Sequence, residues 1–169
     1  MDTSLSSVQE MPILVIGYGS IDQGDAYSGS LVAQMIDKLK LKDINAISVD
    51  TLTPQLAPLI LRAKTVIFIG SYYVYEQMNP EVIIKHFLPH YLTTNFDTGY
   101  DSSPQNLLAF TDAIYHHVPE AYWILIPAIT YRLHDDLSHT TQEAIGKVLN
   151  YFTLDLLSNY KYIAISNDS

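Results

Sequence analysis

The 169 residues suffice for one domain with a single buried core, because a chain of this length buries roughly two-thirds of its unfolded surface. Nine basic residues stand against 18 acidic ones, and the net charge of −9 disfavours nucleic-acid binding, which needs clustered lysine and arginine. The absence of cysteine excludes disulfides, thiolate metal ligands and a cysteine nucleophile.

The first ten residues, Met1 to Glu10, carry two acidic residues, no basic residue and no apolar stretch. We therefore expect a disordered tail there and no secretion signal. No apolar run reaches the ~20 residues that a membrane-spanning helix needs. We expect a cytoplasmic protein with no membrane partner, whose single domain covers residues 11–169.

Strands and helices alternate through the first half of the chain. The apolar run Ile13–Ile16 predicts a strand, and the one-sided apolar stripe of Ser30–Lys40 predicts an amphipathic helix. A second strand is expected over Ala46–Leu52, which alternates and is rich in β-branched residues. Thr53–Ala63 begins with a cap residue followed by proline, which is typical of a helix start. The continuous apolar run Lys64–Gly70 indicates a strand that is buried on both faces.

The second half continues the alternation after an irregular stretch. We expect a short strand over Val82–Ile84, a long loop over His90–Ser103, and a helix that begins at Ser103-Pro104 and reaches Ile114. Tyr122–Pro127 predicts another central strand, and Ser138 is the expected N-cap of a helix that continues to Leu156. Such alternation predicts a three-layer α/β/α sandwich with a mostly parallel central sheet.

A glycine turn, Gly17-Tyr18-Gly19, follows the first strand, where open parallel sheets bind their ligands. One interpretation is a dinucleotide site, with Asp50 at the end of the second strand as its ribose ligand. The third glycine of that fingerprint is missing, because Asp22 stands in its place and would repel a pyrophosphate. A nucleotide-binding domain is therefore the weakest of the alternatives.

The order of several segments resembles the hydrogenase maturation peptidases. Ile13–Gly29 is similar to their opening, which is a strand, Gly-x-Gly-Asn, a spacer, an acidic pair, two residues and glycine. Thr53–Ile69 resembles their second helix and third strand, Ser103-Pro104 their Ser-Pro-His helix start, and Leu133–Ile145 their closing loop and last helix. The resemblance covers nearly the whole chain and implies a phosphorylase/hydrolase-like fold.

The resemblance also implies a task and a metal. These enzymes remove a C-terminal extension from the large subunit of a nickel-containing hydrogenase. They contact the nickel through the second acid of the pair, an aspartate that closes the third strand, and the histidine of Ser-Pro-His. In this chain these positions are Ala26, Gly70 (or Ser71) and Gln105, and the asparagine of the opening turn is Ser20. Since none of them is a carboxylate or an imidazole, we expect that the nickel site is lost.

Two functions are left open by these substitutions. The first is a non-proteolytic binding or assembly factor without a cofactor, which holds a protein partner such as a hydrogenase large subunit or a related subunit. Its cleft would be formed by the family-motif positions Gly17, Gly19, Ser20, Asp25, Ala26, Gly70, Ser71 and Gln105. The second is an endopeptidase with a rearranged site that trims the C-terminus of the large-subunit precursor. Its catalytic candidates are Asp22 and Asp25, and its replacement nickel ligands would come from Asp22, Asp25, Asp101, His134 and His139.

Other polar residues receive simpler interpretations. Asp25 is expected to cap the first helix or its loop. No Gly-x-Ser-x-Gly elbow follows a strand, and the six histidines are interpreted as surface residues. Among thirteen tyrosines, a group falls in a segment that we interpret mostly as loop, which is typical of a contact surface: Tyr72, Tyr73, Tyr75, Tyr91 and Tyr100.

Overall fold

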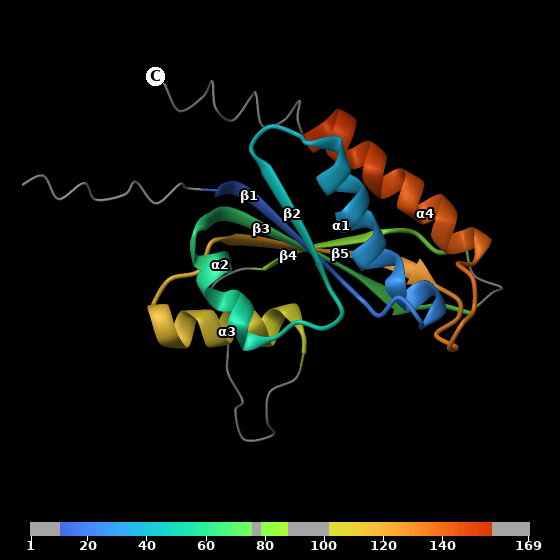
Figure 1. The fold of residues 1–169 in the computed structure, drawn as a ribbon, viewed down its shortest axis with the longest axis horizontal. Coiled ribbons are helices and arrows are strands. Elements are labelled where there is room, and N and C mark those ends of the chain that lie inside the picture. The colour runs from blue at the N-terminus through green and yellow to red at the C-terminus, as the bar shows by residue number, and fades with distance from the viewer. Residues whose placement is uncertain (1–10, 76–78, 88–101, 157–169) are drawn as a thin grey trace, which may run out of the picture.

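The computed structural model describes residues 11–75, 79–87 and 102–156. The expected tail over residues 1–10, nearly all of the expected loop over 90–103, and residues from 157 onward lie outside the described residues, as do Asp101, Tyr91 and Tyr100. Five strands form one sheet in the order β2-β1-β3-β5-β4 (Figure 1). Their bounds are Met11–Tyr18 for β1, Ile44–Val49 for β2, Ala63–Tyr73 for β3, Ile83–Phe87 for β4 and Glu120–Ala128 for β5.

Helices cover both faces of this sheet (Figure 1). On one face lie α1 (Ser28–Leu39) and α4 (His139–Asn150), and on the other lie α2 (Ala57–Leu61) and α3 (Pro104–Tyr115). Short turns complete the order: the 3-10 helices η1 (Gly24–Tyr27) and η2 (Pro54–Leu56), and the π-helix η5 (Tyr151–Leu156). The predicted three-layer α/β/α sandwich is confirmed.

The central strands β1, β3 and β5 are apolar over most of their length because their alternate side chains enter two separate cores. In β1, Ile13 and Val15 pack with α1 and α4, whereas Leu14 and Ile16 pack with α2 and α3. Strands β1, β2, β3 and β5 are parallel, and β4 is the antiparallel edge strand. Parallel strands covered by helices on both faces are expected to be continuous hydrophobic runs, as the middle parts of β1, β3 and β5 are.

Both predicted serine caps are present. The Ser103 hydroxyl accepts a hydrogen bond from the N–H of Asn106 at 3.2 Å, and the Ser138 hydroxyl accepts one from the N–H of Thr141 at 3.3 Å. These bonds satisfy N–H groups in the first turns of α3 and α4 that have no partner within the helix.

Several element boundaries differ from the prediction, among them those of β2 (Ile44–Val49 instead of 46–52) and of α4, which ends at Asn150 instead of Leu156. Three of the differences have a visible cause. The helix expected from Thr53 is divided into η2 and a five-residue α2. The division arises because Pro58 has no N–H with which to continue the helical hydrogen bonds from η2. Strand β3 continues past Gly70 to Tyr73, since residues 70–73 pair with 125–128 of β5. The short strand expected at 82–84 occupies Ile83–Phe87, where β5 supplies an antiparallel partner. Across the described ranges, every helix is too short or too polar to cross a membrane.

Candidate functional site

The candidate site lies beside the carboxyl ends of β1 and β3. The segment between β1 and β2 contains α1, which packs on one face of the sheet. The segment between β2 and β3 contains α2, which packs on the other face. Ligands of open α/β sheets bind at such a switch point. The β1–α1 loop and the β5–α4 loop (residues 129–138) both follow parallel strands and meet at this edge.

Asp25 joins these two loops. It lies in η1 with no exposed surface, and its carboxylate accepts four hydrogen bonds. Its Oδ2 atom accepts from the N–H of Ile129 at 2.7 Å, the N–H of Thr130 at 3.1 Å and the hydroxyl of Ser138 at 2.7 Å. Its Oδ1 atom accepts from the N–H of Ser138 at 2.7 Å.

The prediction that Asp25 caps the first helix or its own loop is wrong. Neither η1 nor α1 has a side-chain cap. The backbone N–H of Asp25 donates to the carbonyl of Thr130 at 3.0 Å, which holds η1 against the β5–α4 loop and turns the carboxylate toward that loop. Burial by itself raises the pKa of this carboxyl group, but the hydrogen bonds from Ser138, Ile129 and Thr130 together outweigh it. The pKa therefore lies below its ordinary value, and Asp25 is ionised at neutral pH.

Tyr18 covers the position where the resemblance expects an aspartate. A Cβ atom built on Gly70 would overlap the phenol ring of Tyr18. The ring therefore crosses β3 above Gly70, and its hydroxyl accepts a hydrogen bond from the indole N–H of Trp123 on β5 at 2.9 Å. Burial raises the pKa of Tyr18 to about 12, although the bond from Trp123 opposes this. Glycine inside a strand often marks such a close approach, so Gly70 indicated one in the sequence, but not that Tyr18 makes it.

The three expected nickel-ligand positions do not fit a nickel ion. Ala26 is half-buried in η1 and has no donor atom in its side chain. Gly70 has neither a side chain nor room for one, and Ser71 uses its hydroxyl in a 3.0 Å hydrogen bond with that of Tyr131. Gln105 is exposed in the first turn of α3, and its amide is a weak ligand beside an imidazole.

The replacement ligands do not gather either. Among the described residues, no three histidine, aspartate or glutamate side chains are grouped so that they could hold a metal ion. Asp22 and His134 are exposed neighbours, since the N–H of His134 donates to the Asp22 carbonyl at 2.8 Å. His139 lies 3.7 Å from Glu143 on the surface of α4, and Asp101 falls outside the described residues.

The opening glycines are explained by packing. A Cβ atom on Gly17 would overlap the Gly29 carbonyl and the Ala33 side chain of α1, so this glycine lets the helix approach β1. Gly19 has a φ of 135°, and a Cβ there would overlap the Ala26 carbonyl. A carbonyl oxygen facing the turn does not suit a phosphate, which is bound by N–H groups. The nearby Ser20 accepts the Gln23 N–H at 3.2 Å through its backbone carbonyl, and Asp50 is exposed after β2.

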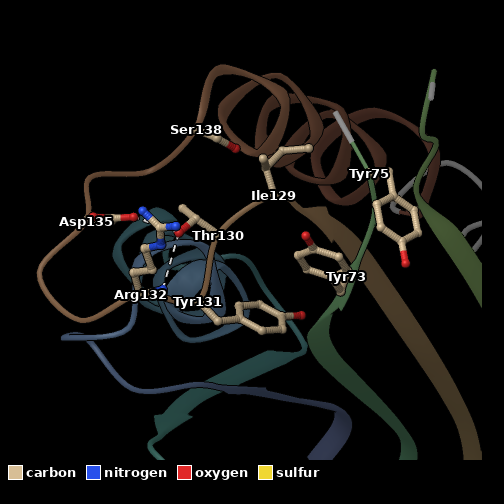
Figure 2. Close-up of a pocket in the computed structure, with 8 residues that line it drawn as sticks. All are labelled: Tyr73, Tyr75, Ile129, Thr130, Tyr131, Arg132, Asp135 and Ser138. Atoms are coloured by element: carbon tan, nitrogen blue, oxygen red, sulfur yellow. Dashed lines mark hydrogen bonds between the residues drawn. The ribbon is translucent and has the colours of Figure 1, made fainter. Parts of the chain in front are cut away.

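A tyrosine-lined cavity of about 920 Å³ opens beside the point where Asp25 joins the β1–α1 and β5–α4 loops (Figure 2). We call it the tyrosine pocket, and it is lined by Tyr73, Tyr75, Ile129, Thr130, Tyr131, Arg132, Asp135 and Ser138. The Tyr73 ring lies 5.6 Å from that of Tyr75 and 6.1 Å from that of Tyr131, measured between centroids. The sequence singled out Tyr73 and Tyr75 but missed Tyr131, whose place just after β5 was the available signal. Tyr72 lies in β3, and its hydroxyl donates to the Glu81 carbonyl at 2.6 Å.

Comparison with known proteins finds similarity in fold. No family model matches the sequence, and no curated protein matches it. The structure is similar to the NiFe hydrogenase maturation protease HycI from Thermococcus kodakarensis KOD1, with a TM-score of 0.64 at 16% identity over 85% of this chain and 91% of that one. It is also similar to the hydrogenase maturating endopeptidase HybD from E. coli, with a TM-score of 0.63 at 17% identity over 88% and 94%. A third similar structure is HybD from Thermococcus kodakarensis, with a TM-score of 0.63 at 18% identity over 84% and 97%.

Proposed function

We propose that this chain is a non-proteolytic protein with the fold of the hydrogenase maturation proteases, which binds a segment of a protein partner at the carboxyl edge of β1 and β3. The observation that carries the proposal is the Tyr18 ring lying over Gly70 and bonded to Trp123. The partner would be a hydrogenase large subunit or a related subunit, met in the cytoplasm during assembly.

The side chains at the edge support binding better than nickel-guided cleavage. Nickel-guided cleavage would need strong ligands that hold the metal beside the peptide bond, where it would supply Lewis-acid chemistry. Ala26 and Gly70 offer no ligand atom, and the Tyr18 ring occupies the space in which a side chain at position 70 would stand. The two loops at this edge, β1–α1 and β5–α4, are nevertheless held together by hydrogen bonds to the Asp25 carboxylate.

Nickel titration and a cleavage assay test the proposal. We expect calorimetry to detect no micromolar nickel binding, and incubation with a nickel-loaded hydrogenase large-subunit precursor to leave the length of that precursor unchanged. The same precursor should be retained by the immobilised chain. HybD from E. coli, assayed on its own precursor, is the positive control for trimming.

Two results would overturn the proposal: nickel binding in the micromolar range, or a shortened precursor. Either would favour the second function, an endopeptidase with a rearranged site for which Asp22 and Asp25 are the candidate residues. Asp22→Ala would then be the first variant to assay, because this exposed side chain can be removed without disturbing the buried joint. Cleavage that persists in Asp22→Ala would place the reaction elsewhere.

A further inference from the structure

The tyrosine pocket presents aromatic rings on a rigid support. Tyr73, Tyr75 and Tyr131 are 56%, 71% and 41% exposed although their rings contact one another. Val74 between the first two is buried, and its N–H donates to the Ala128 carbonyl at 2.8 Å. The backbone that carries the rings is therefore held against β5. Rigid tyrosines provide contact area on binding with little loss of side-chain entropy.

A buried negative charge, the carboxylate of Asp25, lies behind one wall of the pocket. Ile129, Thr130 and Ser138 line the pocket, and all three donate hydrogen bonds to the Asp25 carboxylate. These donors are neutral groups, so they stabilise the charge without cancelling it. The pKa of Tyr131 is raised, mainly by burial of its hydroxyl and further by the charge on Asp25.

A second carboxylate lies at the far end of the pocket. Asp135 accepts a 2.6 Å hydrogen bond from the Thr130 hydroxyl. Figure 2 shows Arg132 extended toward Asp135, at the end away from Tyr73 and Tyr75. Arg132, the cation among the described lining residues, therefore lies away from the tyrosine end, where the Tyr73 and Tyr75 rings remain exposed. The net charge of −9 adds a long-range attraction for cations.

We propose that the tyrosine pocket binds an arginine side chain from an extended, basic segment of the protein partner. Tyrosine faces attract cations, and the planar guanidinium group stacks on aromatic rings. The arginine would lie on the rings of Tyr73 and Tyr75, attracted also by the Asp25 carboxylate that is buried behind the pocket wall. The inference rests on the proposed function in one respect, which is that the occupant is a segment of a protein.

A titration with defined peptides tests this inference. The probe is an acetylated and amidated peptide, Gly-Ser-Arg-Arg-Ser-Gly, and its control carries citrulline, the neutral isostere, in place of both arginines. NMR of the full chain should show saturable shifts of the Tyr73 and Tyr75 ring protons with the arginine peptide. Its affinity should exceed that of the citrulline peptide by about tenfold or more, and it should fall as salt is added.

Matched variants separate the aromatic face from its hydroxyl and its bulk. Tyr73→Phe and Tyr75→Phe keep the ring and should retain the affinity, whereas Tyr73→Leu and Tyr75→Leu should each lower it by about threefold or more. Tyr115→Leu changes an exposed tyrosine of α3 outside the pocket and should have no effect. Tyr75 is the more exposed of the pair, so Tyr75→Leu provides the test even if Tyr73→Leu does not fold.

Several outcomes would overturn the inference. Equal affinity for the citrulline peptide would show that the positive charge is not recognised. Tighter binding of a peptide with glutamate in place of both arginines would show that the pocket binds an acidic side chain through Arg132. Ring shifts that depend on protein concentration without peptide would assign it to a second copy of the chain. Failure of the proposed function would be seen instead as nickel binding or a shortened precursor, neither of which involves these peptides.

Discussion

Replacing Asp25 with asparagine would show how strongly the joint between the β1–α1 and β5–α4 loops depends on a charge. Asparagine preserves the shape of the side chain and one acceptor oxygen. It places an NH₂ group where the other carboxylate oxygen accepts hydrogen bonds. In either orientation of the amide, at least one backbone N–H among those of Ile129, Thr130 and Ser138 then faces another donor.

The expected cost follows from these bonds. With the amide oxygen at the Oδ2 position, only the Ser138 N–H loses its acceptor, and the other three bonds lose the charge that strengthens them. A hydrogen bond to a charged group contributes about 1.5–3 kcal/mol, and an unsatisfied buried donor costs about 1–3 kcal/mol. We therefore expect Asp25→Asn to lower the free energy of unfolding by about 2–4 kcal/mol at neutral pH.

Urea unfolding measured across pH checks both the size and the origin of this loss. Because the folded pKa of Asp25 lies below its ordinary value of 3.8, its stabilisation is complete above that value and is lost as the pH falls through the folded pKa. The asparagine variant has no such dependence at this position, so its deficit should shrink below pH 3.8. Asp22→Asn, an exposed change in the same loop, should alter stability by less than about 0.5 kcal/mol.

The reasoning would be refuted by a loss below about 1 kcal/mol at neutral pH, which is less than one charged hydrogen bond. A deficit of the same size at neutral and at acidic pH would also refute it. In that case the ionised form of Asp25 would not be the source of the stability.

Three further variants test the remaining contacts. Gly70→Asp should lower the free energy of unfolding by about 1–3 kcal/mol because its Cβ overlaps Tyr18, and calorimetry should still detect no nickel binding. Tyr18→Phe removes the acceptor of the Trp123 N–H and should cost about 1–2 kcal/mol in urea unfolding. Since the pKa of Tyr18 rises from 10.0 to about 12 on folding, its stabilisation is present below pH 10 and is lost as the pH rises toward 12, so the variant should decline less there. Ser138→Ala removes a cap and a bond to the buried carboxylate, and should cost about 2 kcal/mol against about 1 for Ser103→Ala, which removes a cap alone.

Most of the fold could be predicted because its signals are local. Apolar runs such as Ile13–Ile16 and the amphipathic stripe of Ser30–Lys40 report burial directly, and the structure confirms a strand and a helix there. Ser103 and Ser138 were recognisable as caps because the bond they form reaches only three residues along the chain. Alternation of strands and helices then leaves few arrangements other than a mostly parallel sheet.

The features that the sequence did not predict depend on residues that lie far along the chain. Strand β3 extends to Tyr73 because β5 pairs with it, and no pattern within β3 itself indicates that length. The role of Asp25 depends on Ile129, Thr130 and Ser138, which lie more than a hundred residues further along the chain. A carboxylate in a loop is most often a cap, so local reasoning assigned it the wrong task.

The sequence by itself determined that Ala26, Gly70 and Gln105 carry no carboxylate or imidazole, wherever these residues lie. Only the tertiary structure decided what stands in their place. The Tyr18 ring passes over Gly70 and reaches Trp123 because the sheet order places β1, β3 and β5 side by side with these residues on one face. Sheet order and register arise from pairing between distant strands, so a local sequence pattern does not encode a contact that spans three of them.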